Sequence, residues 1–354
     1  MIFSSLICEV ISMKIAILGP IYTKEYFGGV ATFDENLAIA YKKIAEENDV
    51  FLYSKQIATK SENSYGIKIC PINILSAFKQ QAFDLIIASL DYAKYLPLMK
   101  ADKKVYFLHG FFSLSAYSSL KTILAVAYQK FFLHYTGYVI GNSQFTCFIN
   151  HEIYNINCNG SVCLGVSYDY MQQLKQSKPI EKEQNSLLFT GRLIEAKKVN
   201  NIIYAMKILK EKADRRYLLR IVGDGDLKPW LMNYAKKYHL NVEFYDRVSQ
   251  TGIVEFYQRS QLFISLNPAE PFGITFCEAL LAGCKIICPN TGGQVEFLSK
   301  YPDMAKMIPN LMPETIAEAV EDLVDNKQQN LVRIQDFSYE NTAKSILRIV
   351  GEDK

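Results

Sequence analysis

The sequence contains no arginine before Arg192, so every fixed positive charge in the first half of the chain is a lysine. A guanidinium that binds a phosphate or carboxylate through two parallel hydrogen bonds is therefore available only from the second half. Positive charge is in small surplus overall, with 39 lysines and arginines against 36 aspartates and glutamates. A surplus of this size does not predict a nucleic-acid partner.

The chain also lacks the usual signs of a metal site or a disulfide framework. Its eight cysteines form no C-x-x-C pair, and its four histidines show no metal-ligand spacing with them. We expect no metal, and we expect the cysteines to be small buried side chains in a reducing cytoplasm. No uninterrupted apolar run reaches the length of about 18 residues that a membrane-spanning helix needs.

Residues 118–135 form an apolar segment that carries aromatic residues together with Lys121 and Lys130. One interpretation is a helix that rests on a membrane surface, with the protein in peripheral contact with the inner membrane. The other is a helix of the protein core. We favour the core helix, because apolar residues cover too much of the circumference for a single interfacial stripe.

The length of 354 residues, with 49% hydrophobic and 21% charged residues, is typical of a globular chain of two domains. From residue 14 onward, short β-branched runs alternate with helix-length segments, which predicts parallel βαβ units. The predicted strands are residues 14–18, 50–53, 84–89, 104–108, 138–140, 187–190, 220–222, 242–245, 262–265, 285–288 and 307–308. The fold class is therefore α/β, with two open parallel sheets and a cleft between the domains.

A polar stretch rich in Gln, Lys and Glu divides the two series of strands, which sets the expected domain boundaries. We interpret this stretch as a linker. The expected parts are a tail or misassigned start at residues 1–12, a first domain at 13–166, the linker at 167–186, a second domain at 187–336 and a C-terminal helix at 337–354 that can pack back on the first domain.

In parallel sheets, ligands bind beyond the carboxyl ends of the strands, so the turns there are the candidate sites. Gly28 and Gly29 follow the first strand and precede a predicted helix, where backbone amides can approach an anion. The loop is too long for a G-x-G-x-x-G turn, which disfavours a nicotinamide cofactor. His109 directly follows strand 104–108 and is either a hydrogen-bonding group of a site or a structural histidine.

The second half carries a more specific set of motifs. Arg192 ends a strand in the sequence Phe-Thr-Gly-Arg, and Lys197 follows five residues later. One forked and one point-like cation can together clamp a diphosphate, although a solvated basic loop is the simpler alternative. The Gly-Asp-Gly-Asp run at residues 223–226 indicates a tight turn more than a metal site.

The most informative stretch is Asn-Pro-Ala-Glu-Pro-Phe-Gly-Ile-Thr-Phe-Cys-Glu at residues 267–278, after a predicted strand. Its apolar spacing predicts a helix that begins near Gly273, with free amides near Ile274 and Thr275. Amides for a phosphate and a carboxylate, Glu278, for a sugar diol are the elements of nucleotide recognition. A carboxylate that only suits the helix dipole would explain Glu278 but not Glu270.

These motifs occur in the order seen in retaining glycosyltransferases of family 4, which the chain resembles from Lys14 to its end. The resemblance rests mainly on the two glutamates eight residues apart, Glu270 and Glu278, with Arg192 and Lys197 upstream. It implies a GT-B fold, in which the first Rossmann-like domain holds the acceptor and the second holds a nucleotide-sugar donor. The implied activity transfers a sugar with retention to a glycan or lipid-linked acceptor, in surface polysaccharide or glycoconjugate synthesis.

The resemblance also implies a role for each matching residue. Gly28 and Gly29 would offer backbone amides to the donor, and Arg192 and Lys197 would neutralise its diphosphate. Glu278 would hold the ribose, and His109 would touch the donor sugar near the reacting carbon. Contacts to the transferred sugar and the phosphates would come from Glu270 and from the backbone of Phe272, Gly273, Ile274 and Thr275.

Two positions depart from the family pattern, since Lys198 stands where a glycine usually follows the lysine and residues 163–167 match the usual hinge only in part. We expect a cytoplasmic enzyme that needs neither a metal nor a cofactor and uses a nucleoside diphosphate sugar, UDP-sugar being favoured. Two alternatives are a nucleotide-sugar epimerase of the same architecture and a non-catalytic partner subunit of another transferase. The paired glutamates disfavour the first, and the presence of His109, Arg192, Lys197 and Glu278 disfavours the second.

Overall fold

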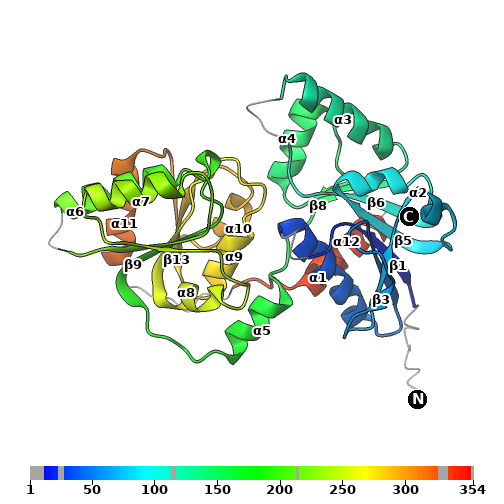
Figure 1. The fold of residues 1–354 in the computed structure, drawn as a ribbon, viewed down its shortest axis with the longest axis horizontal. Coiled ribbons are helices and arrows are strands. Elements are labelled where there is room, and N and C mark those ends of the chain that lie inside the picture. The colour runs from blue at the N-terminus through cyan, green and yellow to red at the C-terminus, as the bar shows by residue number, and fades with distance from the viewer. Residues whose placement is uncertain (1–11, 23–27, 113–116, 213–214, 326–333, 352–354) are drawn as a thin grey trace, which may run out of the picture. The chain divides into compact units, whose positions relative to one another are not determined.

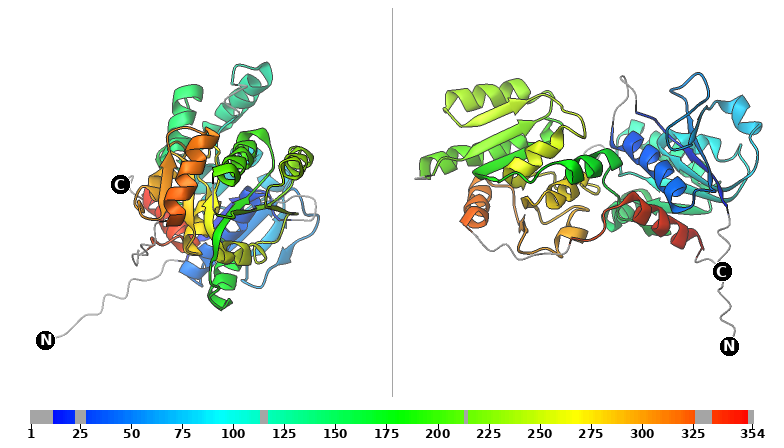
Figure 2. Two further views of the ribbon diagram at one scale, coloured as in Figure 1. Left: turned by 90° about the vertical axis from the view of Figure 1, so that its left-hand side faces the viewer. Right: turned by 90° about the horizontal axis from the view of Figure 1, so that it is seen from below.

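The computed structural model describes residues 12–22, 28–112, 117–212, 215–325 and 334–351. The predicted tail, residues 1–12, lies outside this range apart from Ser12. The chain divides into two compact units, one formed by residues 1–165 and 338–354 and the other by residues 166–337 (Figure 1). Each unit contains one sheet with helices on both of its faces (Figures 1 and 2).

The first unit is built on an eight-stranded sheet of order β3-β4-β2-β1-β5-β6-β7-β8, parallel except where β3 meets β4. Its strands are β1 (Lys14–Leu18), β2 (Asp49–Ser54), β3 (Ser61–Glu62), β4 (Lys68–Pro71), β5 (Phe83–Ser89), β6 (Ala101–Leu108), β7 (Tyr138–Gly141) and β8 (Gly160–Ser161). Its helices are α1 (Gly29–Ile44), α2 (Ile74–Phe78), α3 (Leu120–Leu133), α4 (Gln144–Tyr154) and α12 (Tyr339–Gly351), with a 3-10 helix, η1, at Leu90–Tyr95.

The second unit is built on a parallel six-stranded sheet of order β11-β10-β9-β12-β13-β14. Its strands are β9 (Glu183–Thr190), β10 (Leu218–Val222), β11 (Val242–Tyr245), β12 (Ser260–Ile264), β13 (Lys285–Pro289) and β14 (Ala305–Ile308). Its helices are α5 (Tyr168–Gln176), η3 (Glu195–Lys197), α6 (Val199–Lys212), α7 (Lys228–Lys237), α8 (Ile253–Arg259), α9 (Ile274–Leu281), α10 (Val295–Leu298) and α11 (Pro313–Asp325).

Both sheets follow the predicted alternation, and the α/β class with two parallel sheets is confirmed. The central strands are buried on both faces, as in β1 and β13, because helices cover each side of the sheet. Sequence analysis missed β4, a half-buried strand that begins with Lys68 and ends with Pro71. Its pairing with β2 sets its conformation, which its composition does not favour.

The chain crosses between the units twice, and the two crossings run side by side. The amide of Val166 donates to the carbonyl of Phe337 at 2.8 Å. A side chain at Gly165 would collide with the backbone of Ser338 and Tyr339, so the close approach of the two segments requires glycine there. After this crossing, α12 packs against α1 of the first unit.

The predicted linker at residues 167–186 is wrong. Ser167 accepts a hydrogen bond from the amide of Tyr170 and begins α5, and Glu183 begins β9; both elements belong to the second unit. Helix α5 buries only Tyr170 in full, and most of its other residues are polar because they face solvent. Its polar composition therefore resembles that of a linker.

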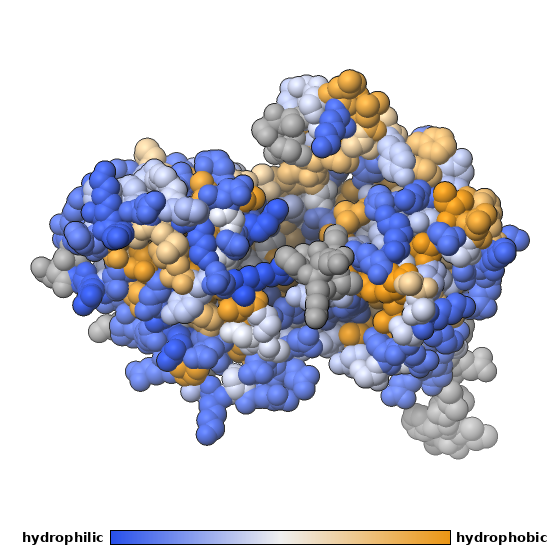
Figure 3. Space-filling model, in the orientation of Figure 1, coloured by the Kyte–Doolittle hydropathy of each residue, from blue (hydrophilic) through white to orange (hydrophobic). Residues whose placement is uncertain are grey.

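The prediction of a core helix at residues 118–135 holds for only one side of the helix, where Val126, Phe132 and Leu133 pack against the core. Helix α3 fully buries only Thr122, and Leu120, Leu124 and Phe131 are 72%, 60% and 58% exposed. Figure 3 shows the apolar surface that results at α3. Within the described parts of the chain, no helix is long and apolar enough to cross a membrane.

Candidate functional site

The loop after β9 is fixed by the neighbouring turn after β10. The amide of Gly191 donates to Val222 at 3.1 Å, and the amide of Leu193 donates to Asp224 at 2.8 Å. A side chain at Gly223 would collide with the carbonyl of Gly191, so the two turns touch through backbone alone. The Gly-Asp-Gly run is thus a structural turn, as predicted. Its contacts with the loop after β9 fix the position of the Arg192 backbone.

Arg192 is exposed, and its guanidinium has no ion-pair or hydrogen-bond partner among the described residues. Lys197 ends the short helix η3 in the same loop. Lys198 follows it with a left-handed backbone, φ 52°, and its ammonium lies 2.8 Å from Glu195. A glycine adopts this conformation without strain, which accounts for the glycine usual at this position.

Lys197 and Glu270 come together although they are 73 residues apart in the sequence. The Nζ atom of Lys197 lies 2.6 Å from Oε2 of Glu270, which also accepts a hydrogen bond from the side-chain amide of Asn267 at 3.0 Å. The side chains are 22% and 15% exposed, so solvent reaches both charges. The structure therefore brings two of the predicted site residues into direct contact.

The N-terminus of α9 lies three residues beyond Glu270. Gly273 precedes the helix with a φ of 88°, and no side chain caps the first turn. A side chain at Gly273 would collide with the ring of Phe276, so glycine is required for both its conformation and its space. The amides of Ile274 and Thr275 thus open a helix whose N-terminal end favours an anion.

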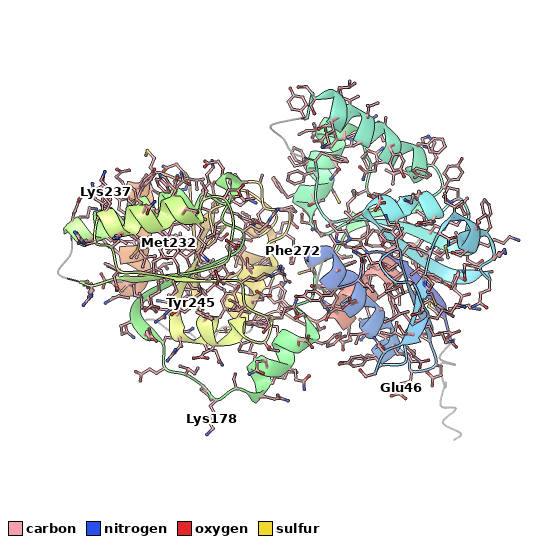
Figure 4. All side chains as sticks on the ribbon, viewed as in Figure 1. Glu46, Lys178, Met232, Lys237, Tyr245 and Phe272 are labelled. Carbon is pink, nitrogen blue, oxygen red and sulfur yellow. The ribbon has the colours of Figure 1, made fainter. Side chains whose placement is uncertain are left out.

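The segment before α9 is held from two sides. The carbonyl of Glu270 accepts a hydrogen bond from the amide of Gly293 at 2.8 Å, and the carbonyl of Pro268 accepts one from Thr291 Oγ1 at 2.9 Å. Phe272, labelled in Figure 4, is buried, and its ring centroid lies 5.3 Å from that of Phe297. The loop after β13 therefore supports the position of Glu270, and Phe272 is a packing residue.

Glu278 lies within α9, where two tyrosines donate hydrogen bonds to it. The Tyr257 hydroxyl donates to Glu278 Oε2 at 2.9 Å, and it lies 3.0 Å from the hydroxyl of Thr190 at the end of β9. The Tyr170 hydroxyl donates to the Glu278 carbonyl at 2.8 Å. Burial raises the pKa of the Glu278 carboxyl to about 7, and the hydrogen bond from Tyr257 opposes this shift.

In the first unit, His109 follows β6 and is half-buried. Its Nε2 atom lies 2.8 Å from the Ser89 hydroxyl, which donates to Oδ1 of Asp34 at 2.7 Å. The ring of Phe33 meets the imidazole edge-on, with centroids 4.8 Å apart. Burial lowers the pKa of His109 to about 3, so the ring is neutral at physiological pH.

Gly28 and Gly29 lie at the start of α1, as predicted. Gly28 precedes the helix in an extended conformation, and no side chain caps the first turn. A side chain at either glycine would meet none of the described residues within 4 Å, so packing against them does not require glycine at these positions. The open space leaves the amides of this turn accessible to a ligand.

Several residues of these settings were not predicted, among them Asp34 and Tyr257. Asp34 carries a signal in the sequence, because an acid stands on the otherwise apolar face formed by Phe33, Leu37 and Tyr41. Tyr257 carries none, since a tyrosine on a buried helix is ordinary. Over the described residues, no three His, Cys, Asp or Glu side chains gather closely enough to hold a metal ion.

The chain forms two Rossmann-like units, and the second places a helix N-terminus, a lysine and an arginine at the ends of its strands. This arrangement defines a protein of the GT-B fold. Solved structures agree. The sucrose-phosphate synthase of Thermosynechococcus elongatus superposes with a TM-score of 0.66, at 14% identity, over 96% of this chain and 94% of that one. A glycosyltransferase from Rickettsia africae gives 0.65, at 16% identity, over 97% and 94%. Anabaena HepE gives 0.61, at 16% identity, over 96% of each chain.

The match to a family model lies almost entirely within the second unit. The family model described as Glycosyl transferases group 1 matches residues 171–339. An uncharacterised glycosyltransferase of Methanocaldococcus jannaschii is 24% identical over 198 residues, 52% of this chain and 50% of its own length. The N-acetyl-alpha-D-glucosaminyl L-malate synthase of Bacillus anthracis is 26% identical over 128 residues, 36% and 33% of the two lengths. The chain spans half or less of these curated relatives, and the comparisons support a glycosyltransferase of GT-B fold.

Proposed function

We propose that the protein is a retaining glycosyltransferase of family 4, which moves a sugar from a nucleoside diphosphate donor to a glycan or lipid-linked acceptor. The observation that carries the proposal is the contact of Lys197 with Glu270 beside the uncapped N-terminus of α9. A cation, a carboxylate and free amides at one strand end are the groups that a nucleotide sugar requires. The order of the motifs in the sequence supports the same conclusion.

In this proposal the second unit binds the donor. Arg192, Lys197 and the amides of Ile274 and Thr275 bind the diphosphate and stabilise the negative charge that grows on it as the sugar leaves. Glu278 accepts hydrogen bonds from the ribose hydroxyls, and Tyr257 keeps its carboxylate oriented. Glu270 turns from Lys197 toward the hydroxyls of the transferred sugar.

The first unit contributes His109 and the two glycines. His109 is neutral, so it contacts the donor sugar by hydrogen bonding and not by charge. Gly28 and Gly29 offer the amides of the first turn of α1 to the donor or to the acceptor that attacks it. A lipid-linked or glycan hydroxyl is the acceptor in this proposal.

The donor we favour is a UDP-sugar, and we propose that no metal takes part. Two cations and one helix N-terminus together supply the charge that a metal would otherwise bring to the diphosphate. Anabaena HepE, which shares this fold, is described in complex with UDP and glucose. That description supports a uridine nucleotide as the first donor to test.

The decisive experiment incubates the purified chain with UDP-sugars and GDP-sugars, acceptor glycans and excess EDTA, and determines the anomeric configuration of the product. We expect transfer with retention that EDTA leaves unchanged. Arg192→Lys should lose at least about tenfold in kcat, because one ammonium cannot replace the guanidinium fork. Arg216→Lys, another exposed arginine, is the matched control. An inverted product, epimerisation of the donor without transfer, or activity restored only by a metal would each overturn the proposal.

We also propose that α3 brings the protein into peripheral contact with the inner, anionic face of a cytoplasmic membrane, where a lipid-linked acceptor would be found. Its exposed apolar residues include Leu124, Tyr128 and Phe131, and aromatic rings of this kind favour a membrane interface. Helix α3 carries Lys121 and Lys130 and no aspartate or glutamate, so it attracts an anionic surface.

The membrane proposal is tested by sedimentation with vesicles of pure phosphatidylcholine and with vesicles that also contain phosphatidylglycerol. We expect binding to the anionic vesicles only, weakened by salt. The double change Leu124→Ser with Phe131→Ser should abolish it without loss of folding, since both side chains are exposed. Equal binding by this variant, or no binding by the unaltered protein, would refute the contact.

A further inference from the structure

A row of three side chains, of which Asp34 and Ser89 are fully buried and His109 is half-buried, lies at the strand ends of the first unit. The Ser89 hydroxyl touches both Asp34 and His109, at 2.7 Å and 2.8 Å. Ser89 ends β5 and His109 follows β6, the neighbouring strand, while Asp34 comes from α1. In an open α/β sheet, this point, where β1 and β5 lie side by side and the strand order reverses, is where ligands bind.

The position of Asp34 is closely constrained. Its side chain is fully buried, and a side chain at Gly19, after β1, would collide with its carboxyl group. Within the described part of the chain, Oδ2 of Asp34 has no hydrogen-bond partner, and burial raises the pKa of this carboxyl well above its usual range against the opposing hydrogen bond from Ser89. A buried carboxyl with one side-chain partner costs stability, so its presence calls for a role other than packing.

The number of protons on Ser89 sets the tautomer of His109. A hydroxyl has one proton, and that of Ser89 is donated to Oδ1 of Asp34. The contact between Ser89 and His109 must then use a proton carried by Nε2. In a neutral imidazole, Nδ1 is consequently unprotonated and can accept a hydrogen bond.

We propose that Asp34 and Ser89 are positioning residues that hold His109 in the Nε2-protonated tautomer, so that its Nδ1 atom accepts a hydrogen bond from a hydroxyl of the donor sugar. This inference rests on the proposed function for the identity of the ligand, but the tautomer itself does not depend on it. No described residue bonds Nδ1 in the free protein, which leaves this atom to a ligand.

The surroundings fix the plane of the ring as well as its protons. The ring of Phe33 meets the imidazole edge-on, with centroids 4.8 Å apart, and the ring of Phe107 lies tilted against it at 4.9 Å. The backbone carbonyl of His109 accepts a hydrogen bond from the side-chain amide of Asn142 at 2.9 Å. The ring therefore has one orientation and one tautomer before the ligand arrives, which avoids the cost of ordering it on binding.

The experiment reads the tautomer directly from ¹⁵N spectra of the full chain labelled at histidine. Four histidines give four pairs of signals, and His109→Asn identifies the pair of interest. We expect an unprotonated Nδ1 in the unaltered protein. Asp34→Leu frees Ser89 to donate to Nε2, so the proton should move to Nδ1, whereas Asp34→Asn keeps an acceptor oxygen and should keep the original tautomer.

Kinetics supply the second measurement. Asp34→Leu and Ser89→Ala should lower kcat about tenfold to a hundredfold, the loss usual when the partner that orients a functional histidine is removed, with little change in KM. Asp34→Asn should stay within about threefold. The control is Ser54→Ala, which removes an equally buried hydroxyl from the end of β2 that contacts Tyr92 and not His109.

The tautomer decides the proposal in every case. An unchanged Nε2 proton in both Asp34→Leu and Ser89→Ala would overturn it, whether or not the protein transfers sugar. If Asp34→Leu does not fold, Ser89→Ala should show a mixture of both tautomers, and a single Nε2-protonated form would again overturn it. A shifted tautomer in a protein that transfers no sugar from any donor would support the positioning of His109 and refute the glycosyltransferase.

Discussion

Lys197 and Glu270 neutralise each other in the donor-free protein, with 2.6 Å between the ammonium nitrogen and the nearer carboxylate oxygen. Asn267 holds the same oxygen from the other side. Any diphosphate that binds Lys197 must compete with this carboxylate or share the lysine with it. Under the proposed function, the pair would couple donor binding to the release of Glu270 toward the sugar, and two predictions depend on this coupling.

Lys197→Ala should lower kcat about a hundredfold, or about 3 kcal/mol in transition-state stabilisation, because charge grows on the leaving diphosphate. The variant also leaves Glu270 without its cation, so the free energy of unfolding should fall by about 1 kcal/mol. Steady-state kinetics and a urea titration measure the two effects. Lys198→Ala, which removes the neighbouring exposed ammonium, should keep its turnover; a Lys197→Ala protein with normal turnover would remove the diphosphate role.

Glu270→Gln should separate binding from catalysis. Removing the negative charge beside Lys197 should tighten the binding of UDP several-fold, an effect of about 1 kcal/mol for partly exposed charges at this distance. The same change should lower kcat at least about tenfold, since the carboxylate is lost to the transferred sugar. Calorimetry measures the affinity for UDP, and initial rates with the UDP-sugar give kcat. Weaker binding of UDP by this variant would contradict the competition between carboxylate and diphosphate.

The strand pattern could be predicted because strands buried on both faces appear as short β-branched runs between turns. The same reasoning failed at residues 167–186 and gave only part of the answer at α3. Several apolar residues of α3 are exposed, against their composition. The polar residues of α5 face solvent, as their composition suggests, but they belong to a helix and not to a linker. Which side of a helix meets a neighbour depends on contacts with residues far away in the sequence.

For the candidate site, local spacing was enough to find Glu270, Gly273 and Glu278, since they lie in one turn and the start of one helix. It could not show that Lys197 contacts Glu270 or that Tyr257 contacts Glu278. The first contact is set by the neighbouring positions of β9 and β12 in the sheet, which bring distant loops together. The second joins α8 and α9, the helices that precede and follow β12. Asp34 could have been predicted as a functional residue from the sequence, because a carboxylate on an apolar helix face requires an explanation.

Lys198→Gly should stabilise the protein. Lys198 has a left-handed backbone with a φ of 52°, a conformation that costs a side-chain-bearing residue about 1 kcal/mol and costs glycine little. The greater freedom of glycine in the unfolded chain offsets part of this gain, and the exposed ion pair with Glu195 contributes little. We expect a net increase of up to about 1 kcal/mol in a urea titration, with unchanged kcat. A loss of stability would mean that the ion pair outweighs the backbone strain.

Glu278→Gln should make the protein more stable at high pH while weakening donor binding. The pKa of Glu278 is raised from 4.5 to about 7 in the folded state, so the folded protein holds this proton more tightly than the unfolded chain. The free energy of unfolding therefore falls as pH rises between these two values and stays low above them. By 1.36 kcal/mol per pKa unit, the penalty above pH 7 is about 3 kcal/mol.

Glutamine cannot ionise and still accepts the hydrogen bond from Tyr257, so Glu278→Gln should raise the melting temperature at pH 8 and leave it nearly unchanged at pH 4.5. The control Glu255→Gln alters a carboxylate that is 62% exposed and should show no such difference. In the unaltered protein, the affinity for the donor should decline as pH falls through about 7, because the protonated carboxyl accepts ribose hydroxyls less well. Melting curves and calorimetric titrations at pH 5 to 8 measure both effects. A Glu278→Gln protein that melts lower at pH 8, or whose donor affinity still falls with pH in the same way, would assign the titration to another group.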